Sequence, residues 1–253
     1  MKFSIFQNPL TTWQGNSLII GIFEEDIFPQ LEKINLKINT ESLTKKFLER
    51  DFKGKKGQIL NLEFLDSEIS RLLIIGLGKR NNIDYAYLSN TIADCARRIC
   101  DIEEKSGIFL PWRELENLSF YSVAEIIRLS IYRDNRFNRK KDESFALKEV
   151  EFLGINESKD ISFKEITHIC EGVEFARKLV AAPPNILTPH EMSIQAQNIA
   201  KNHDLEVKIL DKKDCERLSM GAYLAVAKGS DLESKFIHLI YKSKDKIKKK
   251  IAL

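Results

Sequence analysis

The segment Arg71–Gly78, with the sequence Arg-Leu-Leu-Ile-Ile-Gly-Leu-Gly, constrains the fold more than any other stretch of the chain. Its apolar residues stand at consecutive positions, whereas a strand with one face in water alternates apolar and polar residues. A continuous apolar run is typical of a strand that is buried on both faces of a mostly parallel sheet. The segment therefore predicts a sheet that is covered on both sides.

Strands and helices are predicted to alternate around this segment over the first 160 residues. Strand patterns occupy residues 2–6, 17–23, 59–64, 107–110 and 145–153. Helical patterns occupy residues 40–51, 85–103 and 120–132, with these apolar residues on their inward sides: Leu43, Phe47 and Leu48; Leu88, Ile92, Cys95, Ile99 and Ile102; Phe120, Ala124, Ile127 and Ile131. The alternation predicts an α/β unit with a parallel or mixed sheet, which ends near the polar residues 154–160.

A second unit begins with a helix predicted at residues 166–180. Its apolar stripe comprises Ile166, Ile169, Val173, Ala176 and Val180. Pro183 and Pro184 end this helix, because proline lacks a backbone donor and clashes with the preceding turn.

A capped helix start follows within a few residues. Thr188, Pro189 and Glu191 predict a capping box, in which the threonine hydroxyl accepts an orphan amide and the glutamate reaches back to the amide of the threonine.

The remainder of the second unit alternates as well. We expect a helix at residues 189–202, a strand at 205–210, a short helix at 212–218 and a strand at 236–241. Residues 249–253 look like the start of another strand, so the second unit is expected to be incomplete. The predicted domains are residues 1–160 and residues 161–253.

Composition places few limits on function. A net charge of +3, from 40 basic and 37 acidic residues, argues neither for nor against nucleic-acid binding. Cys95, Cys100, Cys170 and Cys215 are scattered, which predicts reduced and mostly buried thiols. The amino-terminal residues do not resemble a secretory signal, and no run of about 18 apolar residues predicts a membrane span. We expect a soluble, cytoplasmic protein.

Gly76 and Gly78 follow a strand and could cradle a phosphate. The dinucleotide-binding pattern requires a third glycine, and its position is occupied by Asn81. A tight turn at the end of a strand is therefore the favoured interpretation.

The histidines and cysteines do not form a recognisable reaction centre. His190-Glu191 resembles the start of a zinc-protease helix, but Ile194 stands where the second histidine is required. His168, His203 and His238 are interpreted as core or surface residues, with His203 near a helix end where it can favour the helix dipole. Cys170 is interpreted as a core residue.

A basic run near the end of the chain is a further candidate. It comprises Lys242, Lys244, Lys246, Lys248, Lys249 and Lys250 and is interrupted by Asp245. A phosphate-binding surface is conceivable. Only Tyr241 supplies an aromatic ring beside the run, so a solvated loop between two strands is favoured.

Three stretches resemble the leucyl aminopeptidase (cytosol aminopeptidase) family. The segment Arg177–Pro189, with Ala-Ala-Pro-Pro-Asn inside it, resembles the interdomain segment of that family. Met220–Ser230, followed by the strand Phe236–Tyr241, resembles the segment that leads into its catalytic core. The amino-acid sequence here is similar to that of the cyanobacterial and plant branch of the family. Tyr132-Arg133 with Arg136-Phe137 is a looser match to its amino-terminal domain.

The resemblance implies a fold and an activity. It implies a macro-domain-like amino-terminal α/β domain, followed by the start of an α/β/α zinc-peptidase-like domain. The implied activity is the removal of amino-terminal residues, preferably leucine, from peptides by two divalent metal ions, manganese or zinc, in a hexamer of two stacked trimers.

The catalytic residues of the family do not map onto this sequence. In the family, every metal ligand and the catalytic lysine and arginine lie beyond the strand that residues 249–253 begin. No catalytic or metal residue is therefore assigned here, no substrate-binding residue is identified, and the chain alone is expected to be inactive. Asp211, Asp214 and Glu216 are interpreted as surface and helix-start groups. The alternatives are a nucleotide- or nucleic-acid-binding module, or an assembly domain without catalysis.

Overall fold

The computed structural model describes residues 1–34, 40–64, 69–137, 146–155, 162–243 and 249–252, without the side chains of residues 33, 34 and 40–42. The chain separates into two compact units, residues 1–176 and residues 177–253. The described residues of each unit form a sheet of their own. The predicted domain boundary, between residues 160 and 161, falls within residues 156–161, which lie outside the described part of the chain.

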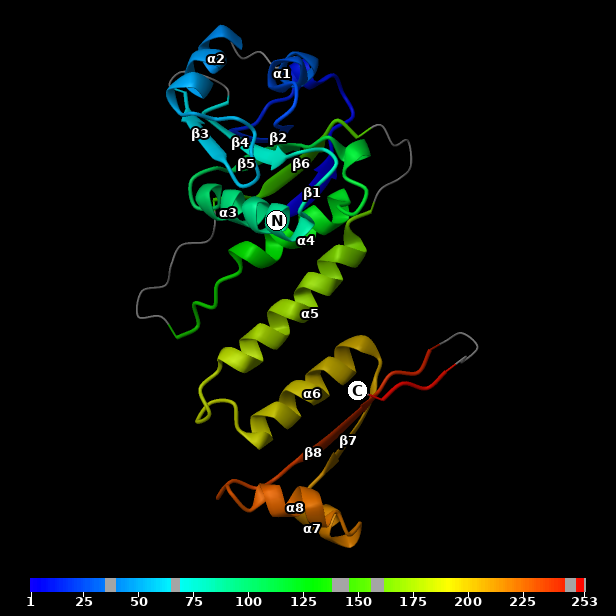
Figure 1. Ribbon diagram of the computed structural model, residues 1–253. Helices are drawn as coiled ribbons and strands as arrows, with labels where there is room; N and C mark the ends of the chain where they lie inside the picture. The colour runs from blue at the N-terminus through cyan, green and yellow to red at the C-terminus, as the bar shows by residue number, and fades with distance from the viewer. Residues whose placement is uncertain (35–39, 65–68, 138–145, 156–161, 244–248, 253) are drawn as a thin grey trace. The chain divides into compact units, whose positions relative to one another are not determined.

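The sheet of the first unit has the strand order β1-β6-β5-β2-β4-β3 (Figure 1). Its strands are β1 (Lys2–Ile5), β2 (Ser17–Phe23), β3 (Ile59–Glu63), β4 (Arg71–Gly78), β5 (Lys105–Phe109) and β6 (Glu149–Leu153). Neighbouring strands run parallel, except that β3 pairs antiparallel with β4. The predicted α/β fold is confirmed, and β4 is buried from Leu72 to Gly78 as its continuous apolar run requires.

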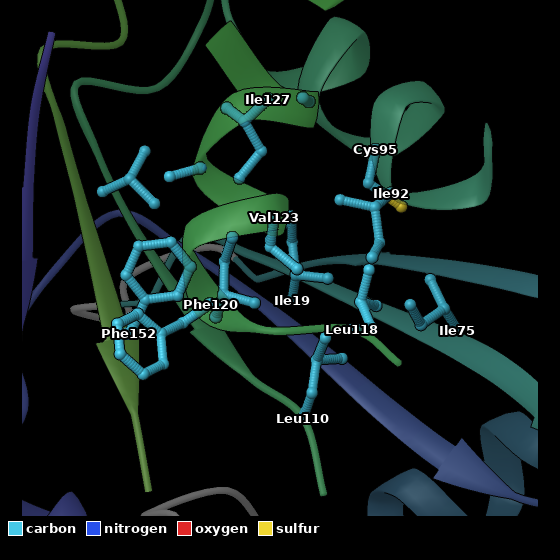
Figure 2. Close-up of a cluster of buried hydrophobic side chains, with 14 of the residues drawn as sticks. Ile19, Ile75, Ile92, Cys95, Leu110, Leu118, Phe120, Val123, Ile127 and Phe152 are labelled. Atoms are coloured by element: carbon cyan, nitrogen blue, oxygen red, sulfur yellow. The ribbon is translucent and has the colours of Figure 1, made fainter. Parts of the chain in front are cut away.

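Helices cover both faces of this sheet, and each face has its own core. On one face, α3 (Tyr85–Ile99) and α4 (Phe120–Ile131) pack against the strands. Figure 2 shows Ile92 of α3 and Val123 of α4 pointing towards the sheet residues Ile19 and Ile75. On the other face, α1 (Ile27–Ile34) and α2 (Thr40–Glu49) contribute the buried residues Leu31, Leu43 and Phe47. No helix had been predicted at α1.

Two residues that were predicted to point inward are exposed. Leu48 is 77% exposed, because Leu43 and Phe47, four positions apart, already define the buried side of α2. Ile102 is 61% exposed, because α3 ends at Ile99 and not at residue 103.

A long helix, α5 (Lys164–Ala181), leads from the first unit into the second. The second unit contains α6 (Pro189–His203), β7 (Glu206–Leu210), α7 (Lys212–Arg217), α8 (Gly221–Ala227) and β8 (Phe236–Ile240). Strands β7 and β8 pair antiparallel. Tyr223 of α8 meets Phe236 of β8 edge to face, with 5.5 Å between the ring centroids.

Two predictions for this part of the chain are wrong. Residues 249–252 form no strand and pair with neither described sheet. The apolar stripe of α5 is not a uniformly buried face: Ile169 is 44% and Val180 is 87% exposed, while Cys170 is buried. None of the described helices is long and apolar enough to cross a membrane.

Candidate functional site

The glycines at the end of β4 accommodate the chain's own backbone. A Cβ atom at Gly76 would collide with the carbonyl oxygen of Lys55. The amide of Gly76 donates to the carbonyl of Gln58 at 2.8 Å, and the amide of Gly78 donates to the carbonyl of Gly54 at 3.0 Å. Both amides that a phosphate would need are therefore bonded already. The interpretation as a strand end is confirmed, and close backbone approach explains the glycines.

An arginine joins the ends of three parallel strands of the same sheet. Arg80 follows β4, and its Nε lies 2.8 Å from Glu114, which follows β5. Its backbone amide donates to Glu25, which follows β2, at 3.3 Å, and its guanidinium lies 4.9 Å from the ring centroid of Phe23. In open α/β sheets, ligands bind beyond the carboxyl ends of the strands. Here that position holds a network of the protein's own charged side chains.

The start of α6 is capped as predicted, but only in part. The hydroxyl of Thr188 accepts the amide of Glu191 at 3.2 Å, and Pro189 occupies the first turn. The carboxylate of Glu191 does not return to the cap; it accepts from Nε2 of Gln195 at 2.7 Å. The second half of the predicted capping box is therefore wrong, because a side-chain donor one turn further along competes for the carboxylate.

A complete capping box is found at α7. Asp211 accepts the amide of Asp214 at 2.9 Å, and Asp214 accepts the amide of Asp211 at 3.3 Å. The hydrogen bond from the Asp214 amide lowers the pKa of the Asp211 carboxyl below its usual range. The interpretation of these residues as helix-start groups is confirmed, and Glu216 is an exposed residue of the same helix.

Three of the histidines lie on different elements, His168 on α5, His203 on α6 and His238 on β8. Nδ1 of His168 lies 3.3 Å from Glu171 on an exposed side of α5. His203 lies in the last turn of α6, and His238 lies on β8 opposite Lys208. In the part of the chain that the structure describes, no three His, Cys, Asp or Glu side chains gather in a way that could hold a metal ion.

All four cysteines are free and buried, as predicted. Burial raises the pKa of the Cys95 thiol to about 12 and also raises that of Cys100. At neutral pH the Cys95 thiol therefore carries almost no thiolate, which fits a packing role for this residue.

The basic run is only partly described. Lys242 forms an ion pair with Glu206 of the paired strand. Lys244, Asp245, Lys246 and Lys248 lie outside the described residues. Lys249 and Lys250 are exposed and belong to no strand. Tyr241 is also exposed.

Sequence reasoning missed the contacts that hold α5 to the first unit. Arg128 of α4 donates two hydrogen bonds to the carboxylate of Glu174, one from Nε at 2.8 Å and one from a terminal nitrogen at 3.0 Å. The hydrogen bond to Glu174 raises the pKa of Arg128. Phe163, just before α5, stacks on Phe152 at 5.5 Å with an interplanar angle of 13°. No periodic pattern reveals an ion pair between residues 46 positions apart.

Part of the looser motif is also structural. Arg133 lies 2.7 Å from Asp101, and Arg136 lies 2.7 Å from Asp134 with its guanidinium 5.0 Å from the ring centroid of Phe137. The described residues of the candidate motifs thus act as caps, ion pairs and packing groups.

Comparisons with protein families and solved structures agree with the resemblance. The model of the cytosol aminopeptidase family N-terminal domain matches residues 19–141, and that of the family's catalytic domain matches residues 174–253. A probable cytosol aminopeptidase of Prochlorococcus marinus (strain MIT 9215) is 56% identical over all of this chain and 52% of its own length. The chain thus spans about half the length of the curated relatives it matches.

Two solved structures share the fold. A mutant of tomato leucine aminopeptidase matches 98% of this chain and 52% of its own chain, with 29% identity and a TM-score of 0.83. The bottromycin maturation enzyme BotP in complex with Mn matches 91% of this chain and 46% of its own chain, with 19% identity and a TM-score of 0.67, a likeness of fold alone. The two family models lie in the order of the two compact units and together cover most of the sequence. The chain therefore belongs to the cytosol aminopeptidase family, with one segment matching its N-terminal domain and one matching its catalytic domain.

Proposed function

We propose that the protein to which these residues belong is an aminopeptidase that removes amino-terminal residues, preferably leucine, from peptides. The likeness to tomato leucine aminopeptidase carries this proposal, because it extends over 98% of the chain with a TM-score of 0.83. The relative with 56% identity supports it over the whole chain. The proposal concerns a protein of the length of these relatives.

We propose two divalent metal ions, manganese or zinc, as the cofactors. When bound, such ions activate a water molecule and polarise the scissile carbonyl. The described residues of this chain do not fit such a centre, since no three potential ligands lie together among them. We therefore assign no catalytic step to residues 1–253, and we propose that they are inactive alone.

A role for the first unit follows from where the family segments lie. The first unit and the start of α5 form one body, held by the Arg128–Glu174 pair. The catalytic-domain model begins at residue 174, on this same helix. We propose that the first unit stabilises the start of α5, the helix on which the match to the catalytic domain begins.

Assembly and location belong to the same proposal. We propose a hexamer of two stacked trimers that acts on peptides in the cytoplasm. The support is the family membership and the name of the relatives, which are called cytosol aminopeptidases. Sedimentation velocity of a chain of the relatives' length checks the hexamer.

A chimera tests the activity. Residues 1–253 are joined to the matching remainder of the Prochlorococcus relative, and release of leucine from a chromogenic leucyl amide is measured with and without a chelator. The chimera is expected to release leucine in a chelator-sensitive reaction, whereas residues 1–253 alone are expected to show none. A folded chimera without turnover would contradict the proposed activity, and chelator-sensitive turnover by residues 1–253 alone would contradict the proposed division of labour.

The alternative of a nucleotide-binding module is not favoured. The amides of Gly76 and Gly78 are bonded to the chain's own carbonyls, and Arg80 is bound by Glu25 and Glu114. A nucleotide would have to displace both sets of contacts.

A further inference from the structure

The outer edge of β3 has unpaired backbone groups. Gln58, just before β3, and Phe64, just after it, both form backbone hydrogen bonds towards the β4 side. The carbonyl of Gln58 accepts the amide of Gly76 at 2.8 Å, and the amide of Phe64 donates to the carbonyl of Ser70 at 2.8 Å. Alternate residues of an antiparallel strand face its partner, so Ile59, Asn61 and Glu63 direct their amides and carbonyls away from β4. No described strand pairs with that side of β3.

A hollow of about 400 Å³ runs along this edge. It is lined by Arg50, Phe52, Gln58, Ile59, Leu60 and Asn61. Successive side chains of a strand point to opposite faces of a sheet. A hollow lined by four consecutive residues, from 58 to 61, therefore follows the edge of the strand and not one face of it.

The segment beside the hollow is strongly basic. Residues 43–58 contain six basic side chains, Lys45, Lys46, Arg50, Lys53, Lys55 and Lys56, and two acidic ones, Glu49 and Asp51. Lys46, Lys53 and Lys56 form ion pairs with Glu49, Asp51 and Asp84. In the part of the chain that the structure describes, Lys45, Arg50 and Lys55 form no ion pair. Of these three, Arg50 lines the hollow, Lys45 is an exposed residue of α2, and Lys55 is an exposed residue of the loop that precedes β3.

The basic loop is held in place without a ligand. The side-chain oxygen of Gln58 accepts the amides of Lys53 at 2.8 Å and Lys55 at 3.0 Å, and its nitrogen donates to the carbonyl of Asp51 at 3.0 Å. Gly54, at φ 67°, lies against the backbone of Phe23, where a side chain would not fit. A preorganised loop loses little conformational entropy on binding.

We propose that the outer edge of β3 binds an extended acidic peptide segment as an added strand. The outward backbone groups of Ile59, Asn61 and Glu63 supply hydrogen bonds, and an added strand obtains affinity from such bonds. Arg50 and Lys55 select carboxylate side chains that enter the hollow or its rim. Phe52, which is buried, forms an apolar part of the lining.

The charge dependence is tested by fluorescence anisotropy on residues 1–253. The probe is a labelled hexapeptide of alternating glutamate and valine, with a lysine–valine hexapeptide as its counterpart. At low salt, about 50 mM, Arg50→Glu and Lys55→Glu are each expected to weaken binding of the acidic peptide by about tenfold. Lys201→Glu reverses an exposed charge on α6 and is expected to change binding by less than about twofold.

The backbone dependence is tested at the same edge. Asn61→Pro removes an outward amide and no backbone hydrogen bond to β4. Both Asn61→Pro and Asn61→Ala also remove the side-chain oxygen that accepts from Arg71 of β4. Asn61→Pro is therefore expected to abolish peptide binding, while Asn61→Ala, which keeps the amide, retains it. Amide hydrogen exchange of residues 59–63 is measured as well in the wild-type chain. The acidic peptide is expected to slow this exchange. This measurement tests binding at β3 even if the proline variant does not fold.

Several outcomes would overturn the proposal. The first is that the acidic peptide does not bind. The second is that Lys201→Glu and Arg50→Glu weaken peptide binding equally. The third is that the peptide does not change the amide exchange of residues 59–63. Tighter binding of the lysine peptide would overturn it too. Tighter binding of a single-stranded oligonucleotide of equal charge would assign the surface to nucleic acid instead, and protection of β3 by self-association without peptide would assign it to a second copy of the chain.

Discussion

The two units differ in how much apolar surface they bury. In the first unit, helices on both faces of a six-stranded sheet enclose two cores, and Phe23, Phe152, Ile74 and Ile92 are almost completely buried. In the second unit, the described buried residues are Ser193, Ala196, Ala200 and Cys215, which are all small. Burial of apolar area is the main favourable contribution to folding. The comparison therefore assigns most of the free energy of unfolding to the first unit.

The second unit also exposes large apolar side chains. They are Val180, Ile186, Leu218, Val226, Leu232, Leu239, Tyr241 and Ile251. A two-stranded sheet such as β7-β8 is marginal without a hydrophobic layer on it. Although both units match one family, the second unit is therefore expected to be less stable than the first.

The largest expected effect comes from truncating the core of the first unit. Phe152→Ala removes a fully buried ring that contacts Phe3, Trp112, Phe120 and Phe163, and we expect it to lower the free energy of unfolding by about 3–5 kcal/mol. Urea denaturation measures this.

The matched variant lies in the second unit. Leu239 on β8 is 40% exposed, so we expect Leu239→Ala to lower the free energy of unfolding by less than about 1 kcal/mol. Equal losses of unfolding free energy in Phe152→Ala and Leu239→Ala would contradict the assignment of most of the stability to the first unit.

The next effect concerns the attachment of α5. Arg128→Ala leaves the carboxylate of Glu174 without its two hydrogen bonds in a place where both side chains are mostly buried, so we expect a loss of about 1–2 kcal/mol. Arg97→Ala breaks an exposed pair with Asp94 and serves as the control, with an expected change below about 0.5 kcal/mol. If the two arginines cost the same, α5 is not fixed by this pair.

Cysteine labelling compares the two units directly. All four thiols are buried, so each reacts only when its surroundings open. We expect Cys215 of the second unit to be labelled more than about tenfold faster than Cys95, because the second unit opens at a lower cost in free energy. Peptide mass spectrometry measures each rate. Equal rates at neutral pH would show that the units open together.

The smallest effect is the pH dependence of the α7 cap. The pKa of Asp211 is lowered in the folded state, so its stabilising contribution is complete above the unfolded value, near 3.8, and is lost as the pH falls through the folded pKa. A carboxyl titration by NMR is expected to give a midpoint below that of the same residue in the urea-unfolded chain. A midpoint at or above the unfolded value would contradict the capping geometry.

Local features could be predicted from the sequence. The continuous apolar residues of β4 gave its burial, and the proline and threonine positions gave the break between α5 and α6, because both depend on neighbouring residues. The distant contacts could not be predicted. The order of the strands and the Arg128–Glu174 pair depend on which segments meet in space. Leu48 and Ile102 were misplaced for the same reason, since the positions of the buried face and of the helix end are decided by packing.

For the candidate sites too, the sequence predicts local features but not contacts between distant segments. Spacing alone excluded a zinc motif at His190, because Ile194 is not a ligand. It could not show that the loop at residues 54–57 approaches Gly76 and Gly78, which is what fills a possible phosphate site. The β3 edge had no distinctive motif, since an open edge depends on the absence of a neighbouring strand.

Native-state hydrogen exchange of residues 1–253 tests most directly whether the second unit opens at a lower free energy than the first. We expect amides of β2 and β4 to exchange only through global unfolding, whereas amides of β7 and β8 exchange through local opening at a free energy lower by at least about 2 kcal/mol. Equal opening free energies for the two sheets would contradict it, because they would require a cooperative core in the second unit.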